Sequence, residues 1–231
     1  MHKPHPLTCR ILILVLIVFL PLLASCQSLP ATTNPVAATP PGELVFDRDF
    51  KDPSEPWCAE SHYVFGDFYC QDGELHLVAK GEGNIATSSV GDFKDFILQA
   101  RMRSVIKDGA YGLVFRGQPQ PPTFYIFQIN PAGQYQLIQW SQASEQNREL
   151  IPWTASDAIR KDQEPNELKV VAQGSQITLY ANQVELASLT DDSLISGEVG
   201  PVATQKGHAA VSSIKAWKLP EATQEETNLS Q

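Results

Sequence analysis

Flat rings, amides and guanidinium groups recur at alternate positions along several consecutive segments of this sequence. Gln99, Arg101 and Arg103 alternate with apolar residues, as do Phe124 and Gln128. Flat rings can stack on the apolar faces of sugar rings, and planar amides and guanidinium groups can donate to hydroxyls or carboxylates. The side chains whose chemistry and spacing suit such a ligand site are Gln99, Arg101, Arg103, Arg116, Phe124, Gln128 and Trp140.

Paired carboxylates for cleaving a glycosidic bond are the next candidates, since the chain has 26 Asp and Glu residues. A retaining glycosidase needs two carboxylates about 5 Å apart, and glucanases can supply them from one strand with the spacing Glu-x-Asp-x-x-Glu. No glutamate in the chain begins such a string, and the motifs HExxH, GxSxG, CxxC and the P-loop are missing as well. The catalytic residues therefore stay unassigned, and the sequence favours a protein without this enzymatic activity.

Metal ligation has one candidate, the acidic cluster of Asp47, Asp49 and Asp52, whose oxygens could hold calcium. The alternative is turn chemistry ahead of Pro53, which we favour. The histidines of the later chain are scattered: His62, His76 and His208. The sequence thus predicts neither a metal site nor a cofactor, with calcium as a weakly supported alternative.

The N-terminal residues have the features of an export signal. Lys3 and Arg10 precede an apolar run over residues 11–23, which is too short to cross a bilayer as a helix. The run ends in Leu23-Ala24-Ser25-Cys26, which resembles the bacterial lipobox, although an ordinary secretory cleavage site would look similar. We expect cleavage before Cys26, lipidation of its thiol and anchoring to the cell membrane, with the outer membrane slightly favoured by Gln27.

Charge argues against one class of partner. After cleavage the chain keeps 15 Lys and Arg against 26 Asp and Glu, a net charge of −11, and it has no basic run. Phosphate recognition needs clustered cations, so we expect no nucleic-acid partner. We therefore expect the protein to contact the membrane through its lipid, and a glycan to be its ligand.

Two cysteines remain for the folded part, Cys58 and Cys70, which are twelve positions apart. In an oxidising compartment this pair suggests a disulfide, worth about 3 kcal/mol through loop closure. The alternatives are two free thiols or a metal pair, and neither a CxxC spacing nor a histidine cluster supports a metal.

The composition divides the chain into four parts. Residues 1–25 are the leader, and residues 26–42 are a Pro/Thr-rich tether with the lipid on its first residue. Residues 43–219 are long enough for one sizeable core. Residues 220–231 are polar and acidic, and we expect them to be disordered.

The elements that must position the candidate side chains are β-strands. Apolar residues alternate with polar ones over 96–103 and 124–129, and turn signals such as Asp72-Gly73 recur every 8 to 15 residues. One helical turn is expected near Ser156–Ile159. The pattern predicts an all-β fold, with two antiparallel sheets packed face to face.

Ordered strings across the domain carry a family resemblance. Among them are Asp72-Gly73-Glu74-Leu75-His76-Leu77, Tyr111-Gly112-Leu113-Val114-Phe115-Arg116 and Phe124-Tyr125-Ile126-Phe127-Gln128-Ile129. Together they resemble the concanavalin A-like lectin/glucanase jelly roll, and within it the LamG-like branch that includes 3-keto-disaccharide hydrolase-type domains. This resemblance implies a jelly-roll β-sandwich over residues 43–219, a fold that hosts hydrolases, lectins and inert spacers.

Three functions follow as hypotheses. The alternation predicts that the seven candidate side chains share one outward sheet face and bind a carbohydrate, in the manner of a lectin-like module of the cell envelope. The alternative for that face is a solvated sheet whose arginines pair with neighbouring acids. A glycoside-acting hydrolase resembling the 3-keto-disaccharide hydrolases, and a structural adaptor without a small ligand, are the other two hypotheses.

Overall fold

The alternating segments of the sequence form β-strands whose inward side chains meet in a buried core. A computed structural model of the chain describes residues 42–62, 66–81, 85–87, 89–144 and 147–220. The expected leader, the expected lipidation site at Cys26, the tether up to residue 41 and the tail from residue 221 lie outside this part. The described residues belong to one compact unit, which contains all the elements given below.

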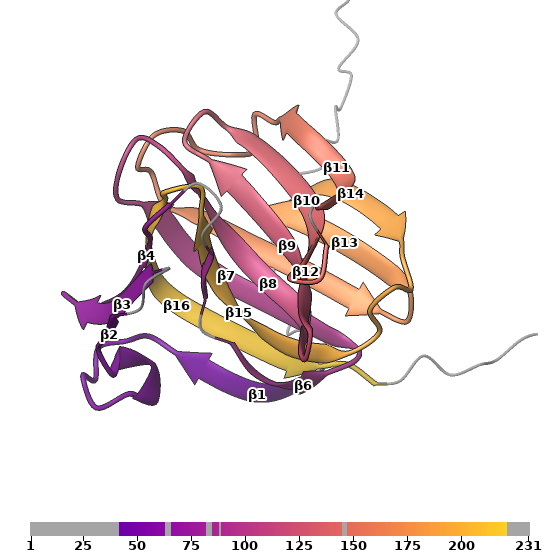
Figure 1. The fold of residues 1–231 in the computed structure, drawn as a ribbon, viewed down its shortest axis with the longest axis horizontal. Helices are drawn as coiled ribbons and strands as arrows, with labels where there is room; N and C mark the ends of the chain where they lie inside the picture. The colour runs from indigo at the N-terminus through magenta and orange to yellow at the C-terminus, as the bar shows by residue number, and fades with distance from the viewer. Residues whose placement is uncertain (1–41, 63–65, 82–84, 88, 145–146, 221–231) are drawn as a thin grey trace, which may run out of the picture. The chain divides into compact units, whose positions relative to one another are not determined.

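Nine strands of the described chain form one antiparallel sheet. They are β1 (Glu43–Arg48), β2 (Ser61–His62), β3 (Gly66–Gln71), β4 (Glu74–Ala79), β7 (Phe96–Ser104), β12 (Asn166–Gln173), β13 (Gln176–Ala181), β14 (Val184–Thr190) and β16 (His208–Lys218). Their order is β14-β13-β12-β7-β16-β4-β3-β2, and β1 pairs with β16 (Figure 1).

Seven strands form the second antiparallel sheet. They are β5 (Ile85–Thr87), β6 (Val90–Phe93), β8 (Ala110–Pro119), β9 (Pro122–Asn130), β10 (Gln134–Ser141), β11 (Arg148–Ala155) and β15 (Gly197–Thr204). Their order is β11-β10-β9-β8-β15-β5, and β6 pairs with β15. The expected all-β, two-sheet jelly-roll sandwich is confirmed.

The two sheets pack face to face, and apolar side chains from both fill the space between them. Large members of this core, each fully buried, are Leu75, Leu77, Phe93, Phe96, Leu98, Met102, Tyr111, Leu113, Phe115, Tyr125 and Phe127. Each apolar square ångström removed from water contributes about 25 cal/mol, so this layer is the main stabilising element. Because successive side chains of a strand point to opposite faces, the alternate side chains of each strand lie on the outer face of its sheet.

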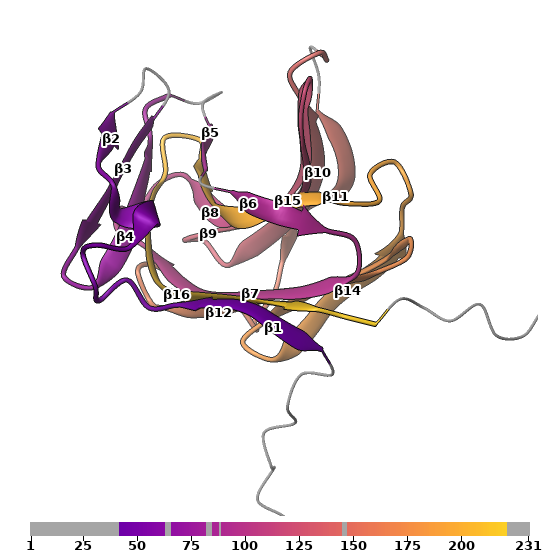
Figure 2. The same ribbon diagram turned by 90° about the horizontal axis from the view of Figure 1, so that it is seen from below.

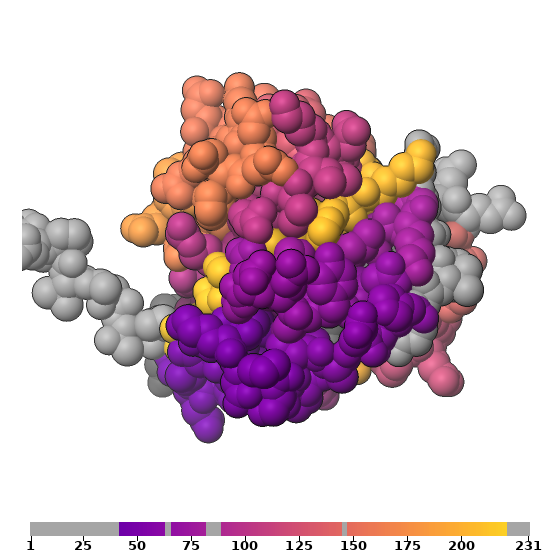
Figure 3. All heavy atoms as spheres, turned by 90° about the vertical axis from the view of Figure 1, so that its left-hand side faces the viewer, coloured from indigo at the N-terminus to yellow at the C-terminus, as the bar shows by residue number. Residues whose placement is uncertain are grey.

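The outer face of the seven-stranded sheet lies between two raised flanks. Figure 2 shows β10 and β11 turning away from the nine-stranded sheet on one side, and β2 to β5 standing on the other. On the side of the molecule seen in Figure 3, the yellow surface of the last strands runs between the purple N-terminal strands and the magenta and orange segments. This agrees with the pairing of β16 to β4 and to β7.

The expected disulfide is confirmed. Cys58 ends the short 3₁₀ helix η1 (Pro56–Cys58), and its sulfur is bonded to that of Cys70 on β3. Trp57 of the same helix packs its ring against Phe46 and Phe50, with centroids 5.9 and 6.2 Å away. The disulfide and these rings together fix the irregular segment between β1 and β3 to the sandwich.

The helical turn expected near Ser156 is replaced by a hydrogen-bonded turn. The amide of Ile159 donates to the carbonyl of Ser156 at 3.2 Å, and no helix forms there. The loop that leads from this turn to β12 contains a second turn, in which the amide of Glu164 donates to the carbonyl of Lys161 at 3.3 Å. Within the described ranges, no helix has the length and apolarity needed to cross a membrane.

Candidate functional site

The seven candidate side chains do not share one face, and the prediction that they do is wrong. Phe124 and Gln128 on β9 and Trp140 on β10 lie on the outer face of the seven-stranded sheet. The β7 side chains Gln99, Arg101 and Arg103 lie on the outer face of the nine-stranded sheet. The reason is topological: β7 and β8 follow each other in sequence, but the chain changes sheets between them, and β7 pairs with β12 and β16 instead.

Arg116 belongs to neither outer face, because it is fully buried. The alternation that would turn it outward is interrupted by an irregularity in the pairing of β8 with β9 between Phe115 and Gln118. Arg116 has a φ of 52°, an unusual backbone conformation for a residue with a side chain. The outward prediction for Arg116 therefore fails at this bulge.

Three backbone carbonyls accept hydrogen bonds from the Arg116 guanidinium. They are those of Leu194 at 3.0 Å, Lys94 at 3.2 Å and Gly174 at 2.5 Å, in three separate loops. Burial lowers the pKa of Arg116, while Tyr125, Asp95 and Asp191 act in the opposite direction. Arg116 thus ties together loops from both sheets at one end of the sandwich.

An ion pair between Arg148 and Asp191 lies near this end of the sandwich, where Ser193 and Leu194 follow Asp191. The carboxylate of Asp191, which is 6% exposed, accepts hydrogen bonds from the hydroxyl of Tyr125 and from Arg148. Burial alone would raise the pKa of Asp191, but the hydrogen bonds from Tyr125, Arg148 and Ser193 outweigh it and lower this pKa to about 2. Burial and the neighbouring carboxylate raise the pKa of Tyr125 to about 12.

On β7, Arg103 and its neighbours match the alternative of a solvated face with paired charges. Arg103 forms an ion pair with Glu74 at 2.6 Å. Arg101 is exposed and lies opposite Glu167 on β12 and Ser213 on β16. Gln99 lies between two lysines, Lys169 and Lys215, across the same strands.

The outer face of the seven-stranded sheet carries a second apolar cluster, separate from the main core. It consists of Val114, Ile126, Ile138 and Val202, with Phe124 and Trp140 packed against it. Val114 pairs with Ile126, and Ile126 pairs with Ile138, so three of them form one row across β8, β9 and β10. All four side chains are buried, so the exposed apolar surface of this cluster comes from the partly exposed Phe124 and Trp140.

The rings of Phe124 and Trp140 are stacked beside this cluster. The two residues are cross-strand partners, their centroids are 4.9 Å apart and their planes differ by 21°. Both side chains are partly exposed. They form an aromatic platform at the edge of the apolar row.

Polar side chains form a chain of hydrogen bonds on the other side of the apolar row. Thr204 on β15 donates to Gln128 on β9 at 2.6 Å, Gln128 donates to Gln136 on β10 at 2.7 Å, and Gln136 donates to Glu149 on β11 at 2.9 Å. The chain crosses β8 at Gly112, where an added Cβ would come within 1.9 Å of a backbone oxygen of β9. Because Gly112 has no side chain, β8 and β9 can lie in close contact at this position.

A pocket of about 270 Å³ opens at the end of β8 that pairs with the start of β9. It is lined by residues of β6, of the end of β8 and of the start of β15: Gly91, Asp92, Gly117, Gln118, Pro119, Ser196, Gly197 and Glu198. Glu198 accepts a hydrogen bond from Ser89 at 2.6 Å. A Cβ at Gly117 would lie 3.5 Å from that of Glu198, so Gly117 faces the same side as this carboxylate.

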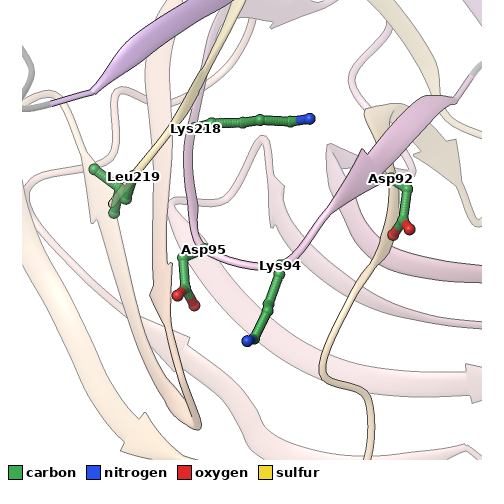
Figure 4. Close-up of a pocket in the computed structure, with 5 residues that line it drawn as sticks. All are labelled: Asp92, Lys94, Asp95, Lys218 and Leu219. Atoms are coloured by element: carbon green, nitrogen blue, oxygen red, sulfur yellow. The ribbon is translucent and has the colours of Figure 1, made fainter. Parts of the chain in front are cut away.

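Another pocket, of about 250 Å³, lies at the end of β16. Figure 4 shows its lining residues, Asp92, Lys94, Asp95, Lys218 and Leu219, with the two lysine side chains extending in different directions. Asp95 accepts a hydrogen bond from the amide of Gly174 at 2.7 Å, and Lys218 lies 5.7 Å from the ring of Phe93. These side chains hold the fold together here and do not converge on a ligand position.

The acidic cluster near the start of the domain takes part in turns and ion pairs. Asp52 accepts from the amide and hydroxyl of Ser54, at 2.9 and 2.7 Å, while Asp49 pairs with Lys51 and Asp47 with Lys215. Within the described part of the chain, no group of three or more His, Cys, Asp or Glu side chains could hold a metal ion.

Several polar residues of the outer face escaped the sequence analysis. Gln136 lies on the same side of β10 as Ile138 and Trp140, two and four positions before them, so the same periodicity could have found it. Thr204 and Glu198 lie on β15, some 70 residues after β9, and only strand pairing brings them here.

A family model described as a 3-keto-alpha-glucoside-1,2-lyase-like domain matches residues 46–219. None of the curated proteins compared with the chain matches it. Among solved structures, a Bacillus subtilis protein of unknown function with a galectin-like fold superposes with a TM-score of 0.60 at 12% identity, covering 78% of this chain and 98% of that one.

Two laminarinases are also similar in structure. The catalytic domain of an endo-1,3-beta-glucanase from Thermotoga petrophila has a TM-score of 0.56 at 8% identity, covering 78% of this chain and 99% of that one. A laminarinase from Flavobacterium sp. has a TM-score of 0.52 at 12% identity, covering 76% and 100%. The chain therefore has the jelly-roll fold found in galectin-like and glucan-hydrolysing proteins.

Proposed function

Because this chain belongs to the family of 3-keto-alpha-glucoside-1,2-lyase-like domains, we propose that it binds a carbohydrate on the outer face of its seven-stranded sheet. The observation that carries this proposal is the stacked pair of Phe124 and Trp140 beside an apolar row. Pyranose rings present apolar C–H faces to such rings and hydroxyls at their rims. An apolar platform between polar groups suits a ligand of this kind.

The polar groups on either side of the platform supply hydrogen bonds. Glu149 ends the side-chain network on one side, and Glu198 lies beside Gly117 on the other. Both are acceptors for sugar hydroxyls when ionised. Their negative charge, together with Asp92 in the adjacent pocket, disfavours uronic acids and sulfated sugars, so the proposed ligand is a glycan without anionic groups.

The experiment is a glycan array with residues 39–231, which contain every described strand. We expect saturable binding to neutral glycans that is lost in Trp140→Ala. The matched control is Tyr180→Ala, which removes an aromatic ring that lies against Lys169 on the opposite sheet. No binding across a broad array would contradict the proposal and favour a structural role without a small ligand.

Cleavage of a glycoside is the second candidate, and the carboxylate of Glu198, which lines the pocket at the end of β8, favours it. A lyase acting across carbons 1 and 2 of a 3-keto glucoside must remove the proton on carbon 2, which the neighbouring carbonyl acidifies, and release the group on carbon 1. A carboxylate can act as the base for the first of these steps.

This second candidate is tested by incubating the same protein with a 3-keto glucoside and measuring the released aglycone. Turnover by the unaltered protein that is lost in Glu198→Gln, and kept in Glu185→Gln on β14, is the expected result for a lyase. A protein that binds glycans without releasing aglycone would leave the binding module as the function.

We also propose that the chain is exported and anchored to the membrane through lipid on Cys26. The leader residues support export, and the disulfide between Cys58 and Cys70 fits an oxidising compartment. Mass spectrometry of the chain expressed in bacteria should find an acylated N-terminal Cys26, and Cys26→Ser should abolish membrane fractionation. An unmodified cysteine in the mature protein would contradict the proposal.

A further inference from the structure

Six side chains without charge form one row across the outer face of the nine-stranded sheet. Strand pairing places them side by side on β14, β13, β12, β7, β16 and β1, in the order Ser188, Thr178, Val171, Ile97, Trp217 and Leu44. Their neighbours along the strands, such as Leu98 and Val170, belong to the core, so the row faces outward. Figure 2 shows β1, β7, β12 and β16 on the side of the molecule away from β10 and β11.

The row is most apolar and most exposed where β1 joins it. Leu44 is 50% exposed, and the following residue, Val45, is 44% exposed. Trp217 is the cross-strand partner of Leu44 and is partly exposed. None of these three side chains belongs to the main core cluster. We call Leu44, Val45 and Trp217 the Trp217 patch.

Lysines accompany the Trp217 patch and the row. Lys215 and Lys169 lie two positions from Trp217 and from Val171 on the same faces of β16 and β12. The two acidic residues of β1 each have a lysine of β16 beside them, since Glu43 lies opposite Lys218 and Asp47 pairs with Lys215 at 2.8 Å. The row itself holds no carboxylate, so this face of an acidic protein is not repelled by the phosphates of a bilayer.

The chain that would carry the lipid enters the domain at the Trp217 patch. Gly42 directly precedes β1, and Cys26 lies sixteen positions before Gly42. Sixteen extended residues reach about 50 Å, so the tether holds the domain near the bilayer without fixing which side faces it. A domain held in this way meets the membrane at an effective concentration in the range of about 1 mM, so a small apolar patch is enough to select one orientation.

We propose that the Trp217 patch rests on the membrane to which the chain is anchored, so that the glycan face on the opposite sheet is turned away from the bilayer. This inference depends on the proposed lipid on Cys26. An indole ring is apolar with one polar N–H, which suits the boundary between headgroups and acyl chains. Leu44 and Val45 enter beside it, and the flanking lysines extend their ammonium groups to the lipid phosphates.

The test uses the full chain, expressed in bacteria and reconstituted into vesicles of phosphatidylethanolamine and phosphatidylglycerol in equal amounts. A spin label is attached to Val171→Cys in the row, three strand spacings or about 14 Å from Leu44, or to Gln142→Cys directly after β10 on the other sheet. Electron paramagnetic resonance compares the access of oxygen, which concentrates in lipid, with that of a nickel complex, which stays in water. We expect the oxygen-to-nickel ratio to be at least about threefold higher at position 171 than at position 142.

Flotation of the same vesicles separates this inference from the proposed anchor. A chain that does not float with the vesicles has no anchor, which contradicts both. A chain that floats but has equal ratios at the two labels, or a higher ratio at position 142, overturns the orientation alone. Poor access of both oxygen and nickel at position 171 would show that a second copy covers the row, and would also overturn it.

A pair of variants tests the apolar contact itself. Leu44→Ser/Val45→Ser changes two exposed side chains, so the fold should persist and the chain should still float. We expect the ratio at position 171 to fall to that at position 142. The matched control is Ile106→Ser, which changes an exposed apolar side chain in the loop after β7 and should leave the ratio unchanged. A ratio that falls in both variants, or in neither, would overturn the assignment of this patch.

Discussion

Trp140 and Phe124 are direct cross-strand partners whose rings stack 4.9 Å apart on the outer face of the seven-stranded sheet. A solvated sheet face rarely keeps two large rings together beside an apolar row, because their exposed area is unfavourable in water. The pair gives this face an aromatic character, and it is the basis of the proposed carbohydrate site.

Arg116 should prove to be a stabilising residue and not a ligand-binding one. Arg116→Ala removes a fully buried side chain and the hydrogen bonds that it donates to three backbone carbonyls, so we expect a loss of about 3 kcal/mol or more in the free energy of unfolding. The matched control is Arg101→Ala, which alters an exposed side chain of the other sheet and should stay within about 0.5 kcal/mol. Urea denaturation measures both; equal effects would contradict the structural role of Arg116.

Asp191 should make the domain sensitive to acid. Its pKa is lowered from 3.8 to about 2 in the folded protein. A carboxylate whose pKa is lower in the folded protein than in the unfolded chain stabilises the fold at pH values above its unfolded pKa. This contribution of about 2 kcal/mol to the free energy of unfolding is therefore complete above pH 4 and is lost as the pH falls through about 2.

The Asp191 prediction is checked by measuring the free energy of unfolding between pH 7 and pH 2. Asp191→Asn should be less stable at pH 7 and should lose less stability on acidification than the unaltered protein. Its exposed neighbour provides the control, Asp192→Asn, which should follow the unaltered profile. A profile for Asp191→Asn parallel to that of the unaltered protein would count against this role.

The disulfide should contribute substantially to stability, because it closes a short loop in the unfolded chain. Reduction should lower the free energy of unfolding by about 3 kcal/mol. The double variant Cys58→Ser/Cys70→Ser should be as unstable as the reduced protein and insensitive to reductant. If reductant destabilises that variant as well, the effect has another source.

Gln128 should stabilise the outer face of the seven-stranded sheet, since it accepts a hydrogen bond from Thr204 and donates one to Gln136. Gln128→Leu leaves Thr204 and Gln136 without this partner, and we expect a loss of about 1–3 kcal/mol. Gln99→Leu, at a half-buried glutamine of the other sheet, is the comparison and should cost little. Thermal unfolding measures the stability of both variants. A Gln128→Leu variant as stable as the unaltered protein would show that these hydrogen bonds contribute nothing to stability.

The sequence was sufficient to predict the fold and part of the outer face of the seven-stranded sheet. Alternation placed Phe124, Gln128 and Trp140 on one side of their strands, since a side-chain period of two is local. It failed for Arg116, because a bulge changes the direction of a side chain without a strong sequence signal. It also failed for Arg101 and Arg103, because strand order depends on which sheet the chain enters after β7, and alternation does not specify that.

The hydrogen bond between His76 and His208 illustrates the same limit. His76 and His208 are 132 positions apart, and only the pairing of β4 with β16 brings their nitrogens within 2.9 Å. Long-range pairing of this kind can be read from the structure but not from spacing in a single sequence.

The most direct test of the carbohydrate face is an NMR titration of ¹⁵N-labelled residues 39–231 with the neutral glycan that binds best on the array. The account predicts shifts confined to amides of β8, β9, β10 and β15 and to the indole of Trp140, and an affinity at least about tenfold weaker, or ~1.4 kcal/mol, in Phe124→Ala and in Trp140→Ala. Shifts centred on β7 and β12, or an affinity unchanged in both variants, would contradict it.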